Sequence, residues 1–365
     1  MGSRPIRSLA LMVLIALAPW RGVALAQTPQ DNFVGVNVHI PSNDMLDAVQ
    51  DLGLKWIRID LNWQDIQPDQ NTAPNYSVHD RVVDEARKRG LKVFATLAYF
   101  PRWATEPGAD DEPNAAPGQR NYHNNVPLPG LYRQVAEQVA AHFAGRIEHW
   151  GLWNETNLSH FFEGTRAQWL DRVVVEGVQG FKAGCSSCKV VGPELAGLDN
   201  YHEWMDVFLE RLATANVSVD VLSWHNYGNF EEIKPVTVCA GIHYFKHLMD
   251  EQRNCFGFPT GSAPMRPVIE KHNLGHLPVW ISETGYKAAK EDPARMANQV
   301  TYYRRVLEEQ AKRSWFTGSF FYELVDDNSA DVPKWGMTYR SGENPTYPAS
   351  YQTKPVWEFI KKAAT

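Results

Sequence analysis

The sequence predicts an α/β fold consisting of a single (β/α)8 TIM barrel, and two observations lead to this prediction. Short β-rich segments alternate with helical segments eight times along the chain. The β-rich segments are almost continuously apolar, which is typical of parallel strands buried on both faces. An open doubly wound sheet is the alternative, but no glycine-rich phosphate-binding loop follows the first strand.

The eight predicted strands are short and rich in apolar residues. They are Phe33–Val38, Trp56–Asp60, Lys92–Leu97, Ile147–Trp153, Lys189–Gly192, Val219–Trp224, Val279–Ser282 and Gly318–Tyr322. Helical patterns separate them, and several end at a glycine, the expected stop signal. They are Asp44–Leu52, Val78–Arg89, Leu131–Phe143, Gln168–Lys182, Asn200–Ala213, Gly241–Arg253, Pro293–Lys312 and Thr353–Lys362. Asp110–Val126 and Phe256–His276 are predicted to be surface excursions.

Residues 1–26 have the pattern of an export signal. Arg4 and Arg7 precede the apolar stretch Leu9–Leu17, which is too short to span a bilayer, and Ala24-Leu25-Ala26 fits a cleavage site. The remainder, residues 27–365, is expected to form one barrel domain. No later segment is long and apolar enough for a membrane helix, so we expect a secreted or periplasmic protein without a membrane partner.

The net charge argues against nucleic acid as a partner. The whole chain carries −6, and residues 1–26 contain three arginines and no acidic residue, which leaves −9 for residues 27–365. Phosphate binding requires a basic surface.

Four cysteines form two candidate pairs. Cys185 and Cys188 make a C-x-x-C motif, and Cys239 and Cys255 are more widely spaced. An exported chain favours disulfides over redox chemistry or zinc. We therefore predict the structural bonds Cys185–Cys188 and Cys239–Cys255. No histidine spacing favours a catalytic metal, and no cofactor is expected.

Polar and aromatic residues concentrate at the carboxyl ends of the predicted strands, where a (β/α)8 barrel builds its active site. They are His39, Arg58, Asp60, Tyr99, Phe100, Arg102, Trp103, Asn154, Glu155, Glu194, His225, Asn226, Tyr227, Glu283, Tyr322 and Glu323. Independent surface loops would be richer in Ser, Asp, Gly and Lys, so we interpret this rim as functional.

Two glutamates stand out on that rim. Trp153-Asn154-Glu155 ends the fourth strand, and Ser282-Glu283-Thr284-Gly285 ends the seventh. A lone exposed glutamate is usually only solvated. Two carboxylates at the mouth of one scaffold, however, are the minimum machinery for cleaving a glycosidic bond. Glu194 and Glu323 are the rival acids, and neither follows an asparagine.

These motifs resemble those of glycoside hydrolase clan A, and most closely those of family 39. The matching segments are Arg58, Pro101-Arg102-Trp103-Ala104, Trp153-Asn154-Glu155-Thr156-Asn157, Gly192-Pro193-Glu194, Ser223-Trp224-His225-Asn226-Tyr227, Ser282-Glu283-Thr284-Gly285, Trp335-Gly336-Met337 and Lys354-Pro355. The likeness covers nearly all of residues 27–365.

The resemblance implies roles for individual residues. Glu155 is expected to be the general acid/base and Glu283 the nucleophile, kept ionised by Arg58 and hydrogen-bonded by Tyr227. Asn154 is expected to bind the substrate 2-hydroxyl, and His225 to line the subsite beside the acid/base. Two positions depart from the pattern: Tyr322 stands where many members carry tryptophan, and Thr156 replaces the usual proline.

Aromatic side chains near the rim are candidates for stacking on sugar rings, with core packing as the alternative for about half of them. They are Trp63, Tyr99, Trp103, Phe161, Phe162, Trp169, Tyr286 and Trp335. We expect Trp63, Trp103 and Phe161 in the cleft. His39, Tyr99 and Tyr322 complete the predicted substrate-binding residues.

The sequence therefore predicts a retaining glycosidase for a β-linked oligo- or polysaccharide. Some exo-acting family 39 enzymes carry an extra domain, so the resemblance, with no second module evident here, implies a monomer that is endo-acting on an extracellular polysaccharide. The alternatives are an exo-acting β-glycosidase such as a β-xylosidase, a non-catalytic carbohydrate-binding barrel, and a metal-dependent hydrolase. Intact Glu155 and Glu283 argue against the binding barrel, and missing metal ligands argue against the metal enzyme. The sugar and its linkage are not specified.

Overall fold

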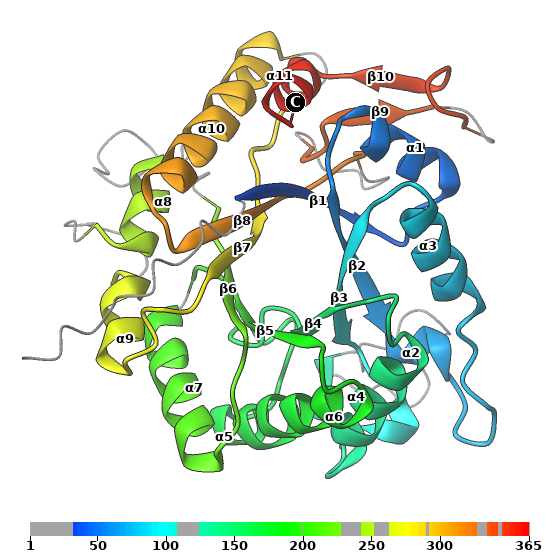
Figure 1. Cartoon of the computed structure of the whole chain (residues 1–365), viewed down its shortest axis with the longest axis vertical. Coiled ribbons are helices and arrows are strands. Elements are labelled where there is room, and N and C mark those ends of the chain that lie inside the picture. Colours follow the sequence, from blue (N-terminus) through cyan, green and yellow to red (C-terminus); the bar gives the residue numbers. More distant parts are fainter. Residues whose placement is uncertain are drawn as a thin grey trace, which may run out of the picture. The chain divides into compact units, whose positions relative to one another are not determined.

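Eight parallel strands close into a barrel in the order β1 to β8, which confirms the predicted (β/α)8 fold. Figure 1 shows the strands in the middle and the helices around them. The computed structural model describes residues 32–107, 124–198, 200–227, 242–251, 263–289, 292–326, 334–341 and 345–364. The predicted export signal, the Cys239–Cys255 pair and most of the predicted Asp110–Val126 excursion lie outside these residues.

The strands begin close to the predicted positions. They are β1 (Phe33–His39), β2 (Trp56–Asn62), β3 (Lys92–Ala98), β4 (His149–Leu152), β5 (Lys189–Leu195), β6 (Val221–His225), β7 (Val279–Thr284) and β8 (Phe316–Phe321). Strands β2, β5 and β7 extend further than the apolar runs predict. Glu194 and Glu283, predicted to follow their strands, therefore lie inside the ends of β5 and β7.

The helices also follow the predicted pattern. They are α1 (Asn43–Asp51), α2 (Trp63–Ile66), α3 (Ser77–Lys88), α4 (Leu131–His142), α5 (Arg166–Trp169), α6 (Glu176–Gly184), α7 (Tyr201–Ala215), α8 (Ile242–Met249), α9 (Met265–Lys271), α10 (Pro293–Lys312) and α11 (Pro355–Ala364), with short 3-10 and π segments η1 (Arg102–Ala104) and η3 (Leu170–Val175). The predicted helix Gln168–Lys182 is thus built from the end of α5, then η3 and α6, joined without a break.

The prediction of a surface excursion over Phe256–His276 is wrong in part. Helix α9 occupies Met265–Lys271, and its Met265 and Ile269 are buried. Its seven residues are too few for a clear helical period, and Pro267 lies inside it. A second unpredicted feature is the antiparallel pair β9 (Thr338–Arg340) and β10 (Tyr351–Thr353), which lies outside the barrel.

A plug of large side chains fills the barrel lumen. It consists of Trp56, Phe94, Val191, Val221, Trp280 and Phe320, with Phe33 packed against it. Most of these rings meet edge to face or tilted, and Phe33 stacks on Trp56; edge-to-face and offset-stacked pairs are the favourable arrangements for aromatic rings. Gly35 and Gly318 leave the room these rings need, since a Cβ added at Gly35 would clash with Phe320 and one added at Gly318 would clash with Phe33.

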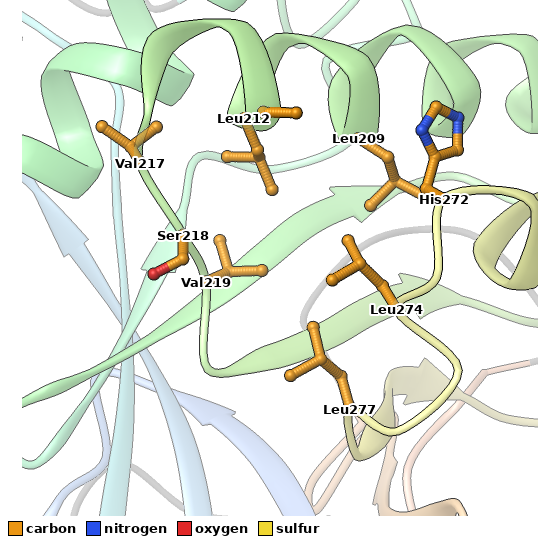
Figure 2. Close-up of a pocket in the computed structure, with 9 residues that line it drawn as sticks. Leu209, Leu212, Val217, Ser218, Val219, His272, Leu274 and Leu277 are labelled. Carbon is orange, nitrogen blue, oxygen red and sulfur yellow. The ribbon is translucent and has the colours of Figure 1, made fainter.

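The disulfide between Cys185 and Cys188 is present and joins the end of α6 to the start of β5. Figure 2 shows an apolar pocket of about 150 Å³, lined mainly by leucine and valine side chains of α7 and of the segments that lead into β6 and β7. These segments precede their strands, so the pocket lies at the opposite end of the barrel from Glu155 and Glu283. In the described part of the chain, no helix combines the length and apolar character needed to cross a membrane.

We predict that Phe320→Ala destabilises the barrel by about 3–5 kcal/mol, because it leaves a cavity in the lumen plug that fixed strands cannot close. Urea unfolding followed by circular dichroism measures this change. The exposed Val78 on α3 provides the control, and Val78→Ala should change the free energy of unfolding by no more than about 0.5 kcal/mol. A loss below about 1 kcal/mol for Phe320→Ala would show that the plug is not tightly packed.

Candidate active site

A buried guanidinium links four strand ends at the carboxyl end of the barrel. Arg58 on β2 donates from Nη1 to Glu283 Oε1 at 2.7 Å and to Asn37 Oδ1 at 2.9 Å. Its Nη2 donates to Asn154 Oδ1 at 3.1 Å and lies 3.0 Å from Glu194 Oε2. Arg58 also lies over the ring of Phe94, 5.8 Å from its centroid, so the lumen plug supports the guanidinium from below.

The charges around Arg58 explain why it can be buried. Burial acts to lower the pKa of Arg58, but the nearby carboxylates of Glu194 and Glu283 raise that pKa above its ordinary value. In turn, burial acts to raise the pKa of Glu194, while the charge of Arg58 and the contact with His225 bring it down to about 2. Arg58 and Glu194 are therefore both charged at neutral pH.

Glu283 is held at both carboxylate oxygens. Arg58 donates to Oε1, and the hydroxyl of Tyr227 donates to Oε2 at 2.7 Å. Burial and the neighbouring charge of Glu283 raise the pKa of Tyr227 well above its ordinary value, so the phenol keeps the proton that it donates. These two hydrogen bonds fix the orientation of the Glu283 carboxyl group.

His225 connects the two glutamates that the sequence singles out. It is paired in register with Glu283 across β6 and β7. Its Nδ1 lies 2.7 Å from Glu155 Oε1 and 3.4 Å from Glu283 Oε2. Burial acts to lower the pKa of His225, but the charges of Glu283 and Glu155 raise it to about 10. His225 is therefore an imidazolium at neutral pH, and its Nδ1–H donates to Glu155.

The two glutamates lie close enough for one sugar carbon to be reached from both. Ligand atoms of Glu155, His225 and Glu283 all lie within 4.8 Å of one another. Retaining glycosidases place their carboxyl groups about 5–5.5 Å apart, and inverting enzymes place them about 6.5–9.5 Å apart. The 4.8 Å limit on the distance between these atoms is closer to the retaining range than to the inverting range.

The same three residues are the group in the described ranges that could hold a metal ion. Their atoms already have other partners, because His225 donates to Glu155 and Glu283 accepts from Arg58 and Tyr227. An ion bound at this position would have to displace the protons and the ion pair that organise the site.

Several site residues have a left-handed backbone. Positive φ angles occur at His39 (52°), Tyr99 (53°), Trp153 (65°), Glu155 (45°) and Glu194 (57°), all at carboxyl ends of strands. In the described ranges, every other non-glycine residue with positive φ is an asparagine, which tolerates this conformation. Such strain is concentrated at functional sites, where surrounding contacts hold it in place.

A second polar cluster lies at the ends of β1 and β8. His39 Nδ1 lies 2.7 Å from Asp60 Oδ2, and its Nε2 lies 3.2 Å from the Tyr322 hydroxyl and 3.3 Å from Glu323 Oε2. Burial acts to lower the pKa of His39, but the contacts with Asp60 and Glu323 raise it above its ordinary value. Glu323 is thus an ion-pair partner of His39.

The aromatic candidates divide between core and rim. The expectation that Trp63 lines the cleft is wrong: it begins α2 and is fully buried, because this turn packs inward. Phe162, Trp169 and Tyr286 are also buried. The half-buried ones are Tyr99, Trp103, Phe161 and Trp335.

Trp335 stands beside the position where tryptophan was expected from the resemblance. Its ring lies 4.8 Å from that of Tyr227 and 6.1 Å from that of Tyr322. The segment after β8 therefore places the Trp335 indole next to Tyr322 and next to Tyr227, whose hydroxyl contacts Glu283.

Asn37 is a site residue that was not predicted from the sequence, and Glu194, which was predicted to lie on the rim, is buried. Asn37 accepts from Arg58 and donates to the Ser282 carbonyl at 3.1 Å, so it ties β1 to β7. Its one sequence signal is that it is the polar residue within an apolar strand. Glu194, considered as a rival acid, is fully buried beneath the rim.

The chain matches the family model described as glycosyl hydrolases family 39 over residues 41–328 and belongs to that family. A search of curated proteins found no match.

Solved structures share the fold at low sequence identity. A family 39 enzyme from Xanthomonas axonopodis pv. citri has a TM-score of 0.65 and 16% identity, with 92% of this chain and 66% of that chain covered. A family 39 β-xylosidase from Caulobacter crescentus has a TM-score of 0.63 and 17% identity, with 92% and 71% covered. Another family 39 hydrolase, from Bacteroides cellulosilyticus WH2, has a TM-score of 0.62 and 17% identity, with 92% of this chain covered but 64% of that one. The chain therefore spans about two thirds of the length of these enzymes.

The His225 site makes a prediction about stability and pH. The pKa of His225 is about 10 in the folded chain, against 6.5 for an ordinary histidine. Protonated His225 therefore stabilises the folded chain, and this contribution is complete below pH 6.5. As the pH rises from 6.5 to 10 the contribution is lost, and the free energy of unfolding falls by up to about 1.4 kcal/mol per pH unit. Urea unfolding across this range should show a steeper decline in wild type than in His225→Gln.

Replacement of the exposed His276 by glutamine is the control for this experiment, and it should leave the wild-type slope unchanged. Equal slopes in wild type and His225→Gln would mean that His225 is neutral in the folded protein.

Proposed function

We propose that the chain is a retaining glycosidase in which Glu155 is the general acid/base and Glu283 the nucleophile. One observation carries this proposal: Glu155 and Glu283 face each other within 4.8 Å, and Arg58 and Tyr227 hold Glu283 at both oxygens. That separation leaves no room for an attacking water between the carboxyl groups.

In the first step, Glu283 attacks the anomeric carbon while Glu155 donates its proton to the departing glycosidic oxygen. The Glu283–sugar ester bond forms as the bond to the leaving group breaks. Asn154 assists because its Oδ1 accepts from Arg58, which orients the amide so that Nδ2 can donate to the sugar 2-hydroxyl. Hydrogen bonds to the 2-hydroxyl strengthen in the transition state.

In the second step, Glu155 acts as a base. It takes a proton from a water molecule, which attacks the anomeric carbon from the side that the leaving group has vacated, and the ester to Glu283 breaks. His225 donates to Glu155 and therefore stabilises the carboxylate form of the base between the two steps.

We further propose endo-action on a β-linked extracellular polysaccharide by a secreted or periplasmic monomer. Half-buried aromatic residues lie on both sides of the two glutamates, with Tyr99, Trp103 and Phe161 on the β3 and β4 side and Trp335 on the β8 side. Aromatic rings suit the apolar faces of sugars, and rings on both sides suit a chain that continues past the cleaved bond. The export signal pattern of residues 1–26 supports the location outside the cytoplasm.

An exo-acting β-xylosidase is the second candidate. The similarity to the β-xylosidase of Caulobacter crescentus favours it. Product sizes from xylan and other β-linked polysaccharides distinguish the two: a mixture of oligosaccharides supports endo-action, and monosaccharide alone supports the exo-enzyme. A non-catalytic binding barrel would release no product.

We predict that Glu283→Gln lowers kcat on aryl β-glycosides by at least about 1,000-fold, or about 4 kcal/mol of transition-state stabilisation, because the nucleophile is lost. Glu155→Gln should be much less harmful for a dinitrophenyl leaving group than for a sugar, because the former departs without a proton. The exposed Glu358→Gln serves as the control and should retain wild-type kcat. Wild-type activity in Glu283→Gln would remove Glu283 from the mechanism.

The stereochemistry of the first product provides a separate prediction. Proton NMR of a fresh reaction mixture should show the β-anomer before mutarotation, since two inversions at the anomeric carbon give net retention. The same spectrum from an authentic inverting enzyme provides the reference. Initial release of the α-anomer would exclude the double displacement.

A further inference from the structure

A third carboxylate lies beneath the two that face the cleft. Glu194 on β5 is fully buried, and its backbone has a left-handed φ of 57°. Its carbonyl oxygen accepts from the Glu155 backbone N–H at 2.9 Å, which ties the two residues together at the main chain. Because Glu194 has no exposed surface, it cannot contact a sugar in the cleft.

Glu194 contacts both cations of the site. Its Oε2 lies 3.0 Å from Arg58 Nη2 and 3.2 Å from Arg58 Nε. The same oxygen lies 3.8 Å from Nε2 of His225, on the opposite side of the ring from the Nδ1 that contacts Glu155. Glu194, His225 and Glu155 thus form a row of carboxylate, imidazole and carboxylate.

The charge of the cluster shows what this third carboxylate contributes. Before reaction, with its proton on Glu155, the cluster holds two positive groups, Arg58 and His225, and two negative groups, Glu194 and Glu283. In the glycosyl-enzyme, Glu283 is a neutral ester and Glu155 is a carboxylate, so the sum is again zero. The negative charge thus moves from Glu283, beside Arg58, to Glu155, beside His225. In each state Glu194 balances the other cation.

We propose that Glu194 is a positioning residue: it keeps His225 charged and hydrogen-bonded to Glu155, while Arg58 remains hydrogen-bonded to Glu283. The inference rests on the proposed double displacement. Without Glu194, the two cations would face a single carboxylate, and a positive excess would lie beside the oxocarbenium-like sugar of the transition state. Such an excess opposes the charge that develops on the sugar.

The groups that surround His225 all bear on its proton. Three carboxyl groups contact it: Glu155 follows β4, Glu194 lies on β5 and Glu283 on β7. Tyr227, just after β6, and Arg58 on β2 lie one contact further away, since both hydrogen-bond to Glu283. The raised pKa of His225, about 10 despite its burial, agrees with three surrounding carboxylates. Replacing Glu194 by a neutral residue removes one of them and must lower that pKa.

The test compares wild type with Glu194→Gln by NMR titration of imidazole-labelled, ligand-free full chain, with the His225 signal assigned by its loss in His225→Gln. We expect the pKa of His225 to fall by at least about one unit. With a dinitrophenyl β-glycoside, kcat should fall at least about tenfold while KM stays within about twofold, because Glu194 does not touch substrate. The alkaline limb of the kcat profile should move to lower pH.

Glu309→Gln is the matched control, because Glu309 on α10 is also buried and is ion-paired to Arg313, the residue that follows this helix, but lies outside the site. The Glu309→Gln variant should have a lower free energy of unfolding than wild type, with the same His225 titration and the same kcat. An unchanged His225 pKa in Glu194→Gln, even with lower activity, would overturn the proposal and leave Glu194 a structural ion pair.

Two further outcomes remain decisive. If Glu194→Gln does not fold, Glu194→Asp carries the test: its shorter side chain withdraws the carboxylate from His225, so an unchanged pKa would overturn the proposal. If wild type cleaves none of the glycosides, the proposed function fails. A lowered His225 pKa would then still show that Glu194 maintains the imidazolium.

Discussion

The ion pair between Arg58 and Glu283 is the constraint on which the rest of the site depends. A guanidinium buried at the top of the lumen plug needs charged partners, because an unpaired buried charge is very costly. Glu283 and Glu194 supply the charges, and Asn37 and Asn154 accept the remaining hydrogen bonds. Each partner is thereby fixed, and Glu283, the proposed nucleophile, is held in one orientation. The preorganisation of the site is a consequence of satisfying one buried cation.

The barrel makes this arrangement possible through register. Parallel strands bring Asn37 opposite Arg58 and His225 opposite Glu283. The aromatic plug below fills the lumen and gives Arg58 a surface to rest on. Above the plug, residues at the ends of β1, β3, β4 and β5 have a left-handed backbone conformation. The packed plug thus makes the base of the site rigid, and the strained backbone at the rim holds the site residues in place.

The fold and the two glutamates could be predicted from sequence because both leave local signals. Buried parallel strands are apolar without alternation, and a glutamate at the end of such a strand is conspicuous. Trp63 shows where this reasoning ends: it follows a strand, but α2 turns it into the core, and no local pattern distinguishes the two environments. Glu194 and Asn37 acquire their roles from residues far away in the chain. Those contacts arise only when the barrel closes, so no spacing in the sequence announces them.

The most direct test of the central claim is to trap the covalent intermediate. Dinitrophenyl 2-deoxy-2-fluoro-β-glycosides of xylose and glucose slow the second step, and mass spectrometry of the digested enzyme identifies the residue that carries the sugar. The account predicts a label on the peptide containing Glu283, at Glu283 itself, and none in Glu283→Gln. A label on Glu155 or Glu194 would contradict the assignment of the nucleophile and, with it, the role given to Arg58.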